Sequence, residues 1–95
     1  MINWKVLSNE LKICYIIYEF TEMKKEKIWF SKLVDILKGE ISRSTISKNL
    51  DKLFDLGIID GKWEKVDNKW TRTFKISGEA KNFINHIYKS TNKSI

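Results

Sequence analysis

Residues 41–59, I-S-R-S-T-I-S-K-N-L-D-K-L-F-D-L-G-I-I, decide the fold of this chain. Ser42 stands where a residue caps a helix over about residues 43–56, and Gly57 stands where a glycine ends one. Short polar and basic side chains occupy the other faces of the first two turns, as in a helix that enters the major groove of DNA. The apolar side chains recur at helical spacing and share one face: Ile46, Leu50, Leu53 and Phe54.

The segment before this stretch predicts a helix over about residues 7–21, with Ser8 or Asn9 as its N-cap. Its apolar positions cover more than one face, because the run from Ile13 to Tyr18 is apolar throughout. A helix of this kind lies either at the centre of a core or in an interface shared with a partner chain. Both positions stay open at this point.

A polar connection, a brief strand and a short helix are predicted between these two helices. Residues 22–27, E-M-K-K-E-K, form a solvated connection. Residues 28–30, I-W-F, are too short for a helix and favour a brief strand. Ser31 then caps a helix over about residues 32–38.

A β-hairpin is predicted over residues 58–76, with Asp67-Asn68 at its tip, because both residues tolerate the positive φ of a type I′ turn. The outer half of one hairpin face is aromatic and basic, which allows cross-strand cation–π contacts between Trp63 and Arg72 and between Lys65 and Trp70. This register places four cross-strand pairs on that face: Ile59 with Ile76, Gly61 with Phe74, Trp63 with Arg72, and Lys65 with Trp70.

A last helix is predicted over about residues 78–90, capped by Ser77, with Glu79 in its first turn. The final six residues, S-T-N-K-S-I, are expected to fray. The apolar stripe of this helix comprises Ala80, Phe83, Ile84, Ile87 and Tyr88.

The predicted order is therefore helix, short strand, helix, helix, hairpin, helix: a mainly α chain with a small β-hairpin, of the α+β class. This order resembles the winged helix-turn-helix domain. The resemblance is densest in F-S-K-L-V-D-I-L (30–37), in residues 42–59 and in W-T-R-T-F-K-I-S-G-E-A-K-N-F-I (70–84). These segments are similar to the small MarR-like and PadR-like regulators of archaea and bacteria, and the resemblance favours an archaeal source.

The resemblance implies a sequence-specific transcriptional regulator that binds double-stranded DNA. In such a protein the helix over residues 43–56 enters the major groove, and the hairpin touches the flanking backbone or the minor groove. The alternative is that these residues have no role in binding: the polar face of the helix is simply solvated, and the lysines and arginine of the hairpin keep an edge strand soluble. The candidate DNA-binding residues are Arg43, Ser44, Thr45, Ser47, Lys48, Asn49, Lys52, Lys65, Lys69 and Arg72. Ser44, Thr45 and Lys48 are predicted to face bases, and Arg43 and Lys52 phosphates.

Composition is compatible with this interpretation. The chain has 95 residues, enough for one domain, and a net charge of +6 that suits a polyanionic partner. Residues 42–76 alone hold eight basic and five acidic side chains, a net +3. Cys14 is the single cysteine, so no disulfide framework is expected and a cytoplasmic location is predicted. The longest apolar run is far too short to span a bilayer, so no membrane association is expected.

No motif predicts catalysis, a metal or a cofactor. His86 and Cys14 are too few for a metal site, which typically has three or four ligands. His86 is expected at the surface, and Cys14 in the core. We therefore expect a binding protein rather than an enzyme.

The sequence allows three further interactions: with a second copy of the chain, with another protein and with a small-molecule effector. Excess apolar surface predicts a homodimer through the helix over residues 7–21, the C-terminal helix or both. An alternative function is a winged-helix interaction module in transcription or replication machinery. A third possibility is a regulator whose effector pocket is lined by Tyr15 and Tyr18, although these side chains are more often simply core.

Overall fold

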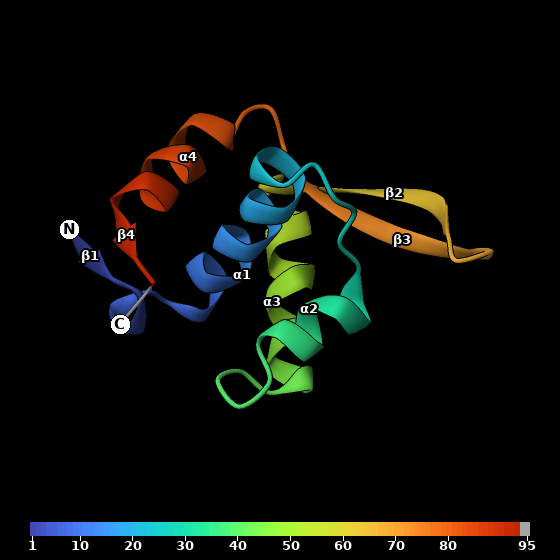
Figure 1. The fold of residues 1–95 in the computed structure, drawn as a ribbon, viewed down its shortest axis with the longest axis horizontal. Helices are drawn as coiled ribbons and strands as arrows, with labels where there is room; N and C mark the ends of the chain where they lie inside the picture. Colours follow the sequence, from blue (N-terminus) through green and yellow to red (C-terminus); the bar gives the residue numbers. More distant parts are fainter. Residues whose placement is uncertain (94–95) are drawn as a thin grey trace.

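Helices form the body of the molecule, and a two-stranded hairpin projects from it (Figure 1). The structure is a computed structural model that describes residues 1–93. Within them it is an α+β protein with four α-helices and a small antiparallel hairpin. The α-helices and strands are β1 (Ile2–Asn3), α1 (Asn9–Tyr18), α2 (Phe30–Ile36), α3 (Arg43–Asp55), β2 (Ile59–Val66), β3 (Lys69–Ile76), α4 (Lys81–Ser90) and β4 (Thr91–Asn92). A 3-10 helix, η1 (Trp4–Val6), precedes α1, and a π-helix, η2 (Glu19–Met23), continues it into the predicted connection.

Helix α1 lies at the centre of the body. Ile13, Ile16 and Ile17 have no exposed surface, and the helix contacts α2, α3, α4 and β3. Ser8 caps it by accepting a hydrogen bond from the Leu11 amide at 3.2 Å. Most of the apolar surface of α1 is therefore covered by the chain itself.

Cys14 is 1% exposed within this core. Burial, with a smaller contribution from the Glu10 carboxylate, raises the pKa of its thiol from 9.0 to about 12. Because the folded pKa lies above the unfolded one, its contribution to stability is complete below about pH 9 and is lost as the pH rises towards 12.

The buried thiol should also be unreactive, because the thiolate is the nucleophile. We expect a thiol reagent such as dithionitrobenzoate to leave Cys14 of the native protein unmodified at pH 8 and to modify it at once in urea. Rapid modification of the native protein would show that the thiol is accessible and contradict its place in the core.

Helix α3 and the hairpin form as the sequence predicts. Ser42 caps α3, and Gly57 follows the helix with φ +72°, the left-handed conformation in which glycine is unstrained. Asp67 and Asn68 turn the hairpin with φ 51° and 66°. The strands have the predicted register, from Ile59–Ile76 at the root to Val66–Lys69 at the tip.

The region before α3 differs from the prediction. Residues 28–30 form no strand: Trp29 makes one isolated bridge to Thr73, and the Ile28 carbonyl accepts a hydrogen bond from the Phe74 amide at 3.0 Å. Helix α2 starts directly afterwards at Phe30 and ends at Ile36, so Ser31 lies inside it and caps nothing. Backbone pairing with β3 holds residues 28 and 29 extended, and the helix begins as soon as that pairing ends.

The start of the C-terminal helix also differs. Helix α4 begins at Lys81 without a side-chain cap. The Ser77 hydroxyl instead donates to the Gly57 carbonyl at 2.7 Å and accepts from the Ala80 amide at 3.4 Å. Ser77 therefore closes a turn before the helix and ties it to the end of α3, and Glu79 lies in that turn.

Two further expectations about the C-terminal region were wrong. Phe83 was predicted on the apolar stripe of the last helix but is 58% exposed. Thr91 and Asn92 do not fray: they pair in parallel with Ile2 and Asn3. Ser94 and Ile95 lie outside the described residues.

An aromatic cluster joins the two ends of the chain. Trp4 packs edge-on against Tyr15 at 5.1 Å, and Tyr88 lies 4.6 Å from Tyr15 and 5.2 Å from Tyr18, all between ring centroids. The Trp4 indole donates to the Glu40 carboxylate at 3.1 Å. Tyr15 and Tyr18 are buried in this cluster, and neither lines either of the two pockets described below.

Candidate nucleic-acid interface

The N-terminal half of α3 presents a polar surface because its apolar stripe is fixed in the core. Ile46, Leu50 and Leu53 are at most 4% exposed, so the opposite side of the helix faces solvent. Ser42 holds the first turn: its hydroxyl accepts from the Thr45 amide at 3.3 Å and donates to the Thr45 hydroxyl at 2.9 Å. The start of the helix is thus well anchored.

The predicted α3 residues fall into two groups. Thr45 and Asn49 are half-buried, and the Thr45 hydroxyl is already hydrogen-bonded within the helix start. The remaining residues are exposed: Arg43, Ser44, Ser47, Lys48 and Lys52.

The three basic side chains of α3 have different surroundings. The Arg43 guanidinium lies over the Phe30 ring of α2, 4.9 Å from its centroid. The Lys52 ammonium lies 3.9 Å from the Glu10 carboxylate of α1, which offsets its charge. Lys48 has no ion pair or side-chain hydrogen bond within residues 1–93. Lys48 is consequently the basic group of α3 that is most available to an anion.

The hairpin carries the other predicted residues. Lys65 and Lys69 are exposed, and their register positions place them on opposite faces. The Lys65 ammonium lies 5.8 Å from the centroid of the Trp70 ring, the predicted cation–π pair. Trp63 and Arg72 are register partners as predicted, but the cation–π contact predicted between them is wrong: Arg72 lies over Phe54 of α3 instead, 4.0 Å from the ring centroid.

Arg72 can contact Phe54 because the residue beside its side chain, Gly61, has no side chain of its own. A Cβ on Gly61 would overlap the Arg72 guanidinium, so only glycine leaves this path open. The contact joins β3 to α3 across the root of the hairpin, where the Phe54 and Phe74 rings also meet at 5.7 Å between centroids. Two predicted DNA-binding elements are thereby held together.

Alanine at Gly61 should therefore displace Arg72 from Phe54. We expect a loss of about 0.5–1 kcal/mol of stability, because the overlapped atoms belong to a flexible side chain that can move. The Arg72 Nε–H resonance should lose the ring-current shift from Phe54 in an NMR spectrum. Gly78→Ala is the matched control, since a Cβ there meets nothing within 4 Å. An unchanged Arg72 resonance in Gly61→Ala would contradict this geometry.

A groove of about 390 Å³ separates α2, α3 and β3. Its walls are largely aromatic, and Arg72 and Asp51 are its charged residues. The groove connects the exposed surface of α3 to the hairpin. It is lined by Trp29, Phe30, Ser31, Ser47, Leu50, Asp51, Phe54, Thr71, Arg72 and Phe74.

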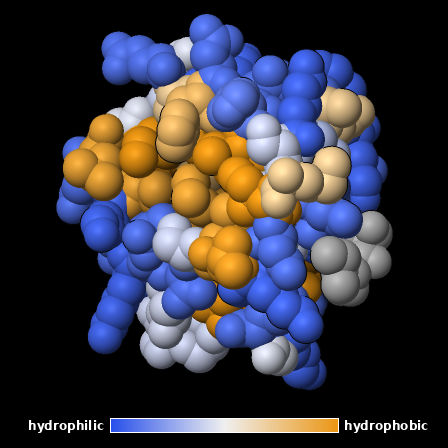
Figure 2. Space-filling model, turned by 90° about the vertical axis from the view of Figure 1, so that its left-hand side faces the viewer, coloured by the Kyte–Doolittle hydropathy of each residue, from blue (hydrophilic) through white to orange (hydrophobic). Residues whose placement is uncertain are grey.

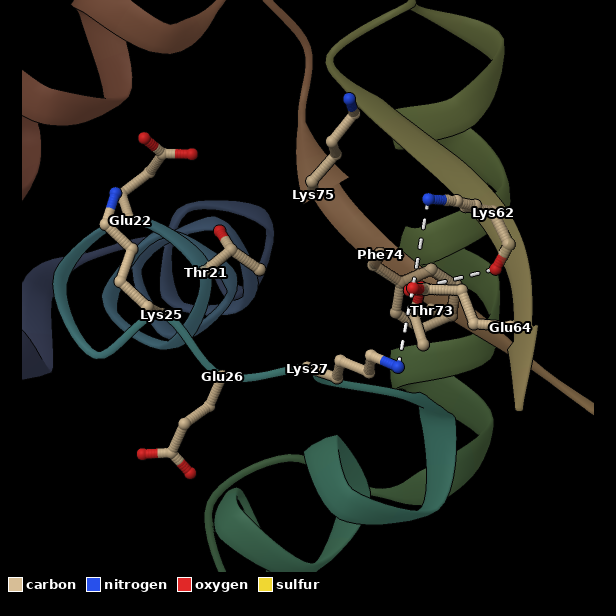
Figure 3. Close-up of a pocket in the computed structure, with 10 residues that line it drawn as sticks. All are labelled: Thr21, Glu22, Lys25, Glu26, Lys27, Lys62, Glu64, Thr73, Phe74 and Lys75. Atoms are coloured by element: carbon tan, nitrogen blue, oxygen red, sulfur yellow. Dashed lines mark hydrogen bonds and ion pairs between the residues drawn. The ribbon is translucent and has the colours of Figure 1, made fainter. Parts of the chain in front are cut away.

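A second pocket, of about 380 Å³, lies on the other side of the hairpin (Figure 3). Glu64 lies on its hairpin wall, 3.5 Å from the Lys27 ammonium and 3.9 Å from that of Lys62, and it accepts a short hydrogen bond from Thr73. That hydrogen bond lowers the pKa of Glu64 below its ordinary value, and the two lysines lower it further against the opposing effect of burial. The Glu64 carboxylate therefore offsets part of the positive charge of Lys27 and Lys62.

Sequence reasoning missed the basic residues around this pocket. Lys27 was assigned to a solvated connection, and Lys62 and Lys75 were not considered as site residues. The hairpin register was the available signal, because it places Lys62, Glu64, Thr73 and Lys75 on the face opposite the aromatic one.

The described part of the chain was found to hold neither a cluster of metal-ligating side chains nor a membrane-crossing helix. Residues 1–93 contain no group of three or more His, Cys, Asp or Glu side chains that could hold a metal ion. Among the same residues, no helix has the length and apolar character that crossing a membrane requires.

Comparisons with known proteins show what this arrangement is similar to. No protein-family model and no curated protein matches the chain. The crystal structure of the circadian clock associated protein Pex from Anabaena has a TM-score of 0.65 and 21% identity, covering 93% of this chain and 77% of that one. Pex from Synechococcus sp. (strain PCC 7942) has a TM-score of 0.59 and 22% identity, covering 87% and 80%. At these identities the likeness concerns the fold alone: this chain has a fold similar to that of the Pex proteins.

Proposed function

We propose that this chain is a winged helix-turn-helix protein, MarR- or PadR-like, that binds double-stranded DNA and regulates transcription. The observation that carries the proposal is the exposed N-terminal half of α3, where Arg43, Ser44, Ser47 and Lys48 stand opposite the buried stripe. Helix α3 enters the major groove in this proposal, because side chains near the start of a recognition helix reach the base edges. Lys48 is the leading contact, since nothing within the described chain neutralises it.

The hairpin supports the same orientation. Its root packs on α3 through Phe54 and Phe74, while its outer half projects beyond the helices (Figure 1). Lys65 and Lys69 are exposed there and would lie on the flanking backbone or in the minor groove. The fold shared with Pex, a circadian clock associated protein, and the net charge of +6 are compatible with a regulator that binds a polyanion.

We further propose that the protein acts as a homodimer through α4. Figure 2 shows a broad apolar patch on the side of the molecule that carries α4 and the paired termini. The exposed or half-buried apolar side chains of these elements include Ile2, Val6, Phe83 and Ile87. A two-fold dimer formed there would place two α3 helices in successive major grooves, about 34 Å apart.

Selection of binding sites from random double-stranded DNA, with light scattering for the mass, tests this proposal. We expect a palindromic consensus and a mass of twice 11.3 kDa. If three basic groups per protomer in the dimer neutralise phosphates, affinity should fall by about 10³-fold between 50 and 200 mM salt. The proposal would be rejected if the selection enriched no sequence, or if the affinity for duplex DNA did not depend on salt concentration.

The apolar patch also favours a second candidate, a winged-helix module that binds another protein. The two candidates differ in what Arg43→Ala with Lys48→Ala should do. Loss of duplex binding by a folded variant favours the DNA-binding regulator. The interaction module is favoured if the wild-type protein binds no duplex but forms a stoichiometric complex with another protein. That complex should persist in the Arg43→Ala, Lys48→Ala variant and be lost in Phe83→Asp.

A further inference from the structure

The outer half of the hairpin displays two tryptophans on one face. Trp63, Lys65 and Trp70 occupy register positions on the same side of the strands, and we name these three residues the indole face. Trp63 is 66% exposed and Trp70 67% exposed, whereas Ile59 and Ile76 at the root of the same face are buried. The indole face therefore stands clear of the core that the hairpin root helps to form.

The two indoles do not serve to stiffen the hairpin by packing on each other. No ring contact joins Trp63 to Trp70 or to another aromatic ring within residues 1–93, and Arg72 lies over Phe54 rather than over Trp63. Lys65 over Trp70, at 5.8 Å, is the one cation–π contact in the indole face. Two large exposed indoles that pack on no other ring of the described chain indicate a binding surface.

The charge of this surface defines the partner. The aromatic side of the hairpin carries Lys65 and Arg72 and no acidic residue, whereas Asp60, Glu64 and Asp67 occupy the other side or the turn. A surface that combines flat aromatic rings with cations fits a polyanion that also offers flat apolar groups. Single-stranded nucleic acid has both properties, because its bases are unpaired and each base has a π-face.

The spacing of the indoles is also compatible with bases. Trp63 pairs with Arg72, so Trp70 is its diagonal neighbour across the strands, at an expected separation of about 7–8 Å. Successive nucleotides on one strand rise by about 3.4 Å, so this separation takes one base between the rings.

We propose that the indole face binds unpaired bases of single-stranded DNA or RNA, with Trp63 and Trp70 stacking on the bases and Lys65 contacting the phosphate beside them. This activity goes beyond the proposed reading of duplex DNA, because it uses no residue of α3. A duplex cannot replace the single strand at this surface, since paired and stacked bases hide their faces.

Fluorescence anisotropy with a short labelled oligothymidylate tests the proposal. A DNA duplex with the same number of nucleotides is the second probe. Trp63→Ala with Trp70→Ala should weaken oligothymidylate binding by at least about 5-fold, since one stacked base contributes about 5- to 150-fold. The conservative Trp63→Phe with Trp70→Phe variant should retain most of the affinity. Circular dichroism checks that each variant is folded.

Lysine variants supply the matched control. Lys65→Ala removes a charge from the indole face, and Lys69→Ala removes the same charge from the opposite face near the tip. Lys65→Ala should weaken oligothymidylate binding more than Lys69→Ala does. Arg43→Ala with Lys48→Ala should weaken duplex binding and leave oligothymidylate binding intact, which separates failure of this proposal from failure of the proposed function.

Two results would overturn the proposal. The first is a folded Trp63→Ala, Trp70→Ala variant that binds oligothymidylate as tightly as the wild type. The second is a wild-type protein that does not bind oligothymidylate at low salt but binds vesicles of anionic lipid, or a protein, through the same two tryptophans.

Discussion

Alanine in place of Ile16 lowers the free energy of unfolding by about 2–5 kcal/mol. Ile16 has no exposed surface and lies in the helix that contacts α2, α3, α4 and β3. Removing its side-chain atoms leaves a cavity at the centre of the body that the surrounding helices cannot fill without moving. A domain of this size has only about 5–15 kcal/mol of stability, so this single change removes a large share of it.

Urea unfolding followed by circular dichroism measures the loss. Leu56→Ala is the control, because Leu56 is 62% exposed and its truncation should change stability by at most about 0.5 kcal/mol. The Ile16→Ala loss should be independent of protein concentration. A small loss, or one that grows on dilution, would mean that a partner chain rather than this chain buries α1.

Arg43→Ala combined with Lys48→Ala lowers the affinity for the selected duplex by about 30-fold or more if both side chains contact base edges, because each such contact contributes about 1–3 kcal/mol of discrimination. If both groups instead contact phosphates, the slope of log affinity against log salt becomes shallower by about 2 per protomer. Anisotropy titrations at several salt concentrations distinguish these two contributions.

Lys24→Ala combined with Lys25→Ala is the control with the same change in net charge. Both lysines are exposed and lie between Met23 and α2, outside α3, the hairpin and the proposed dimer surface. This control should change affinity by only a small factor. Equal losses in the two double variants would indicate non-specific attraction to the whole protein and would remove α3 from the interface.

Local signals explain why α3 and the hairpin could be predicted. A serine cap, a glycine with positive φ and an Asp-Asn turn act within a few residues, so the sequence determines them directly. The start of α2 could not be predicted in this way, because Trp29 and Ile28 are held extended by β3, more than forty residues later in the chain. The pairing of residues 2–3 with 91–92 is likewise non-local.

The residues of the candidate site likewise comprise some whose position follows from local sequence and others whose contacts depend on tertiary packing. Periodicity correctly placed Ser44 and Lys48 on the exposed side of α3. It could not show that Lys52 meets Glu10, because that contact depends on how α1 packs against α3. The register alone predicted a contact between Arg72 and Trp63. The observed contact of Arg72 with Phe54 depends on how α3 packs beside the hairpin and on the missing side chain of Gly61, and neither can be inferred from the register.

The parallel pairing of β1 with β4 nearly closes the chain into a ring. Asn3 lies beside Asn92, so a short linker between β4 and β1 would not have to cross the molecule. The protein is therefore a natural candidate for circular permutation, with new ends opened at the exposed Asp67-Asn68 turn or in the charged segment over residues 24–27. A permutant opened in that charged segment would keep α3 and the hairpin contiguous while changing the order in which the remaining helices are synthesised.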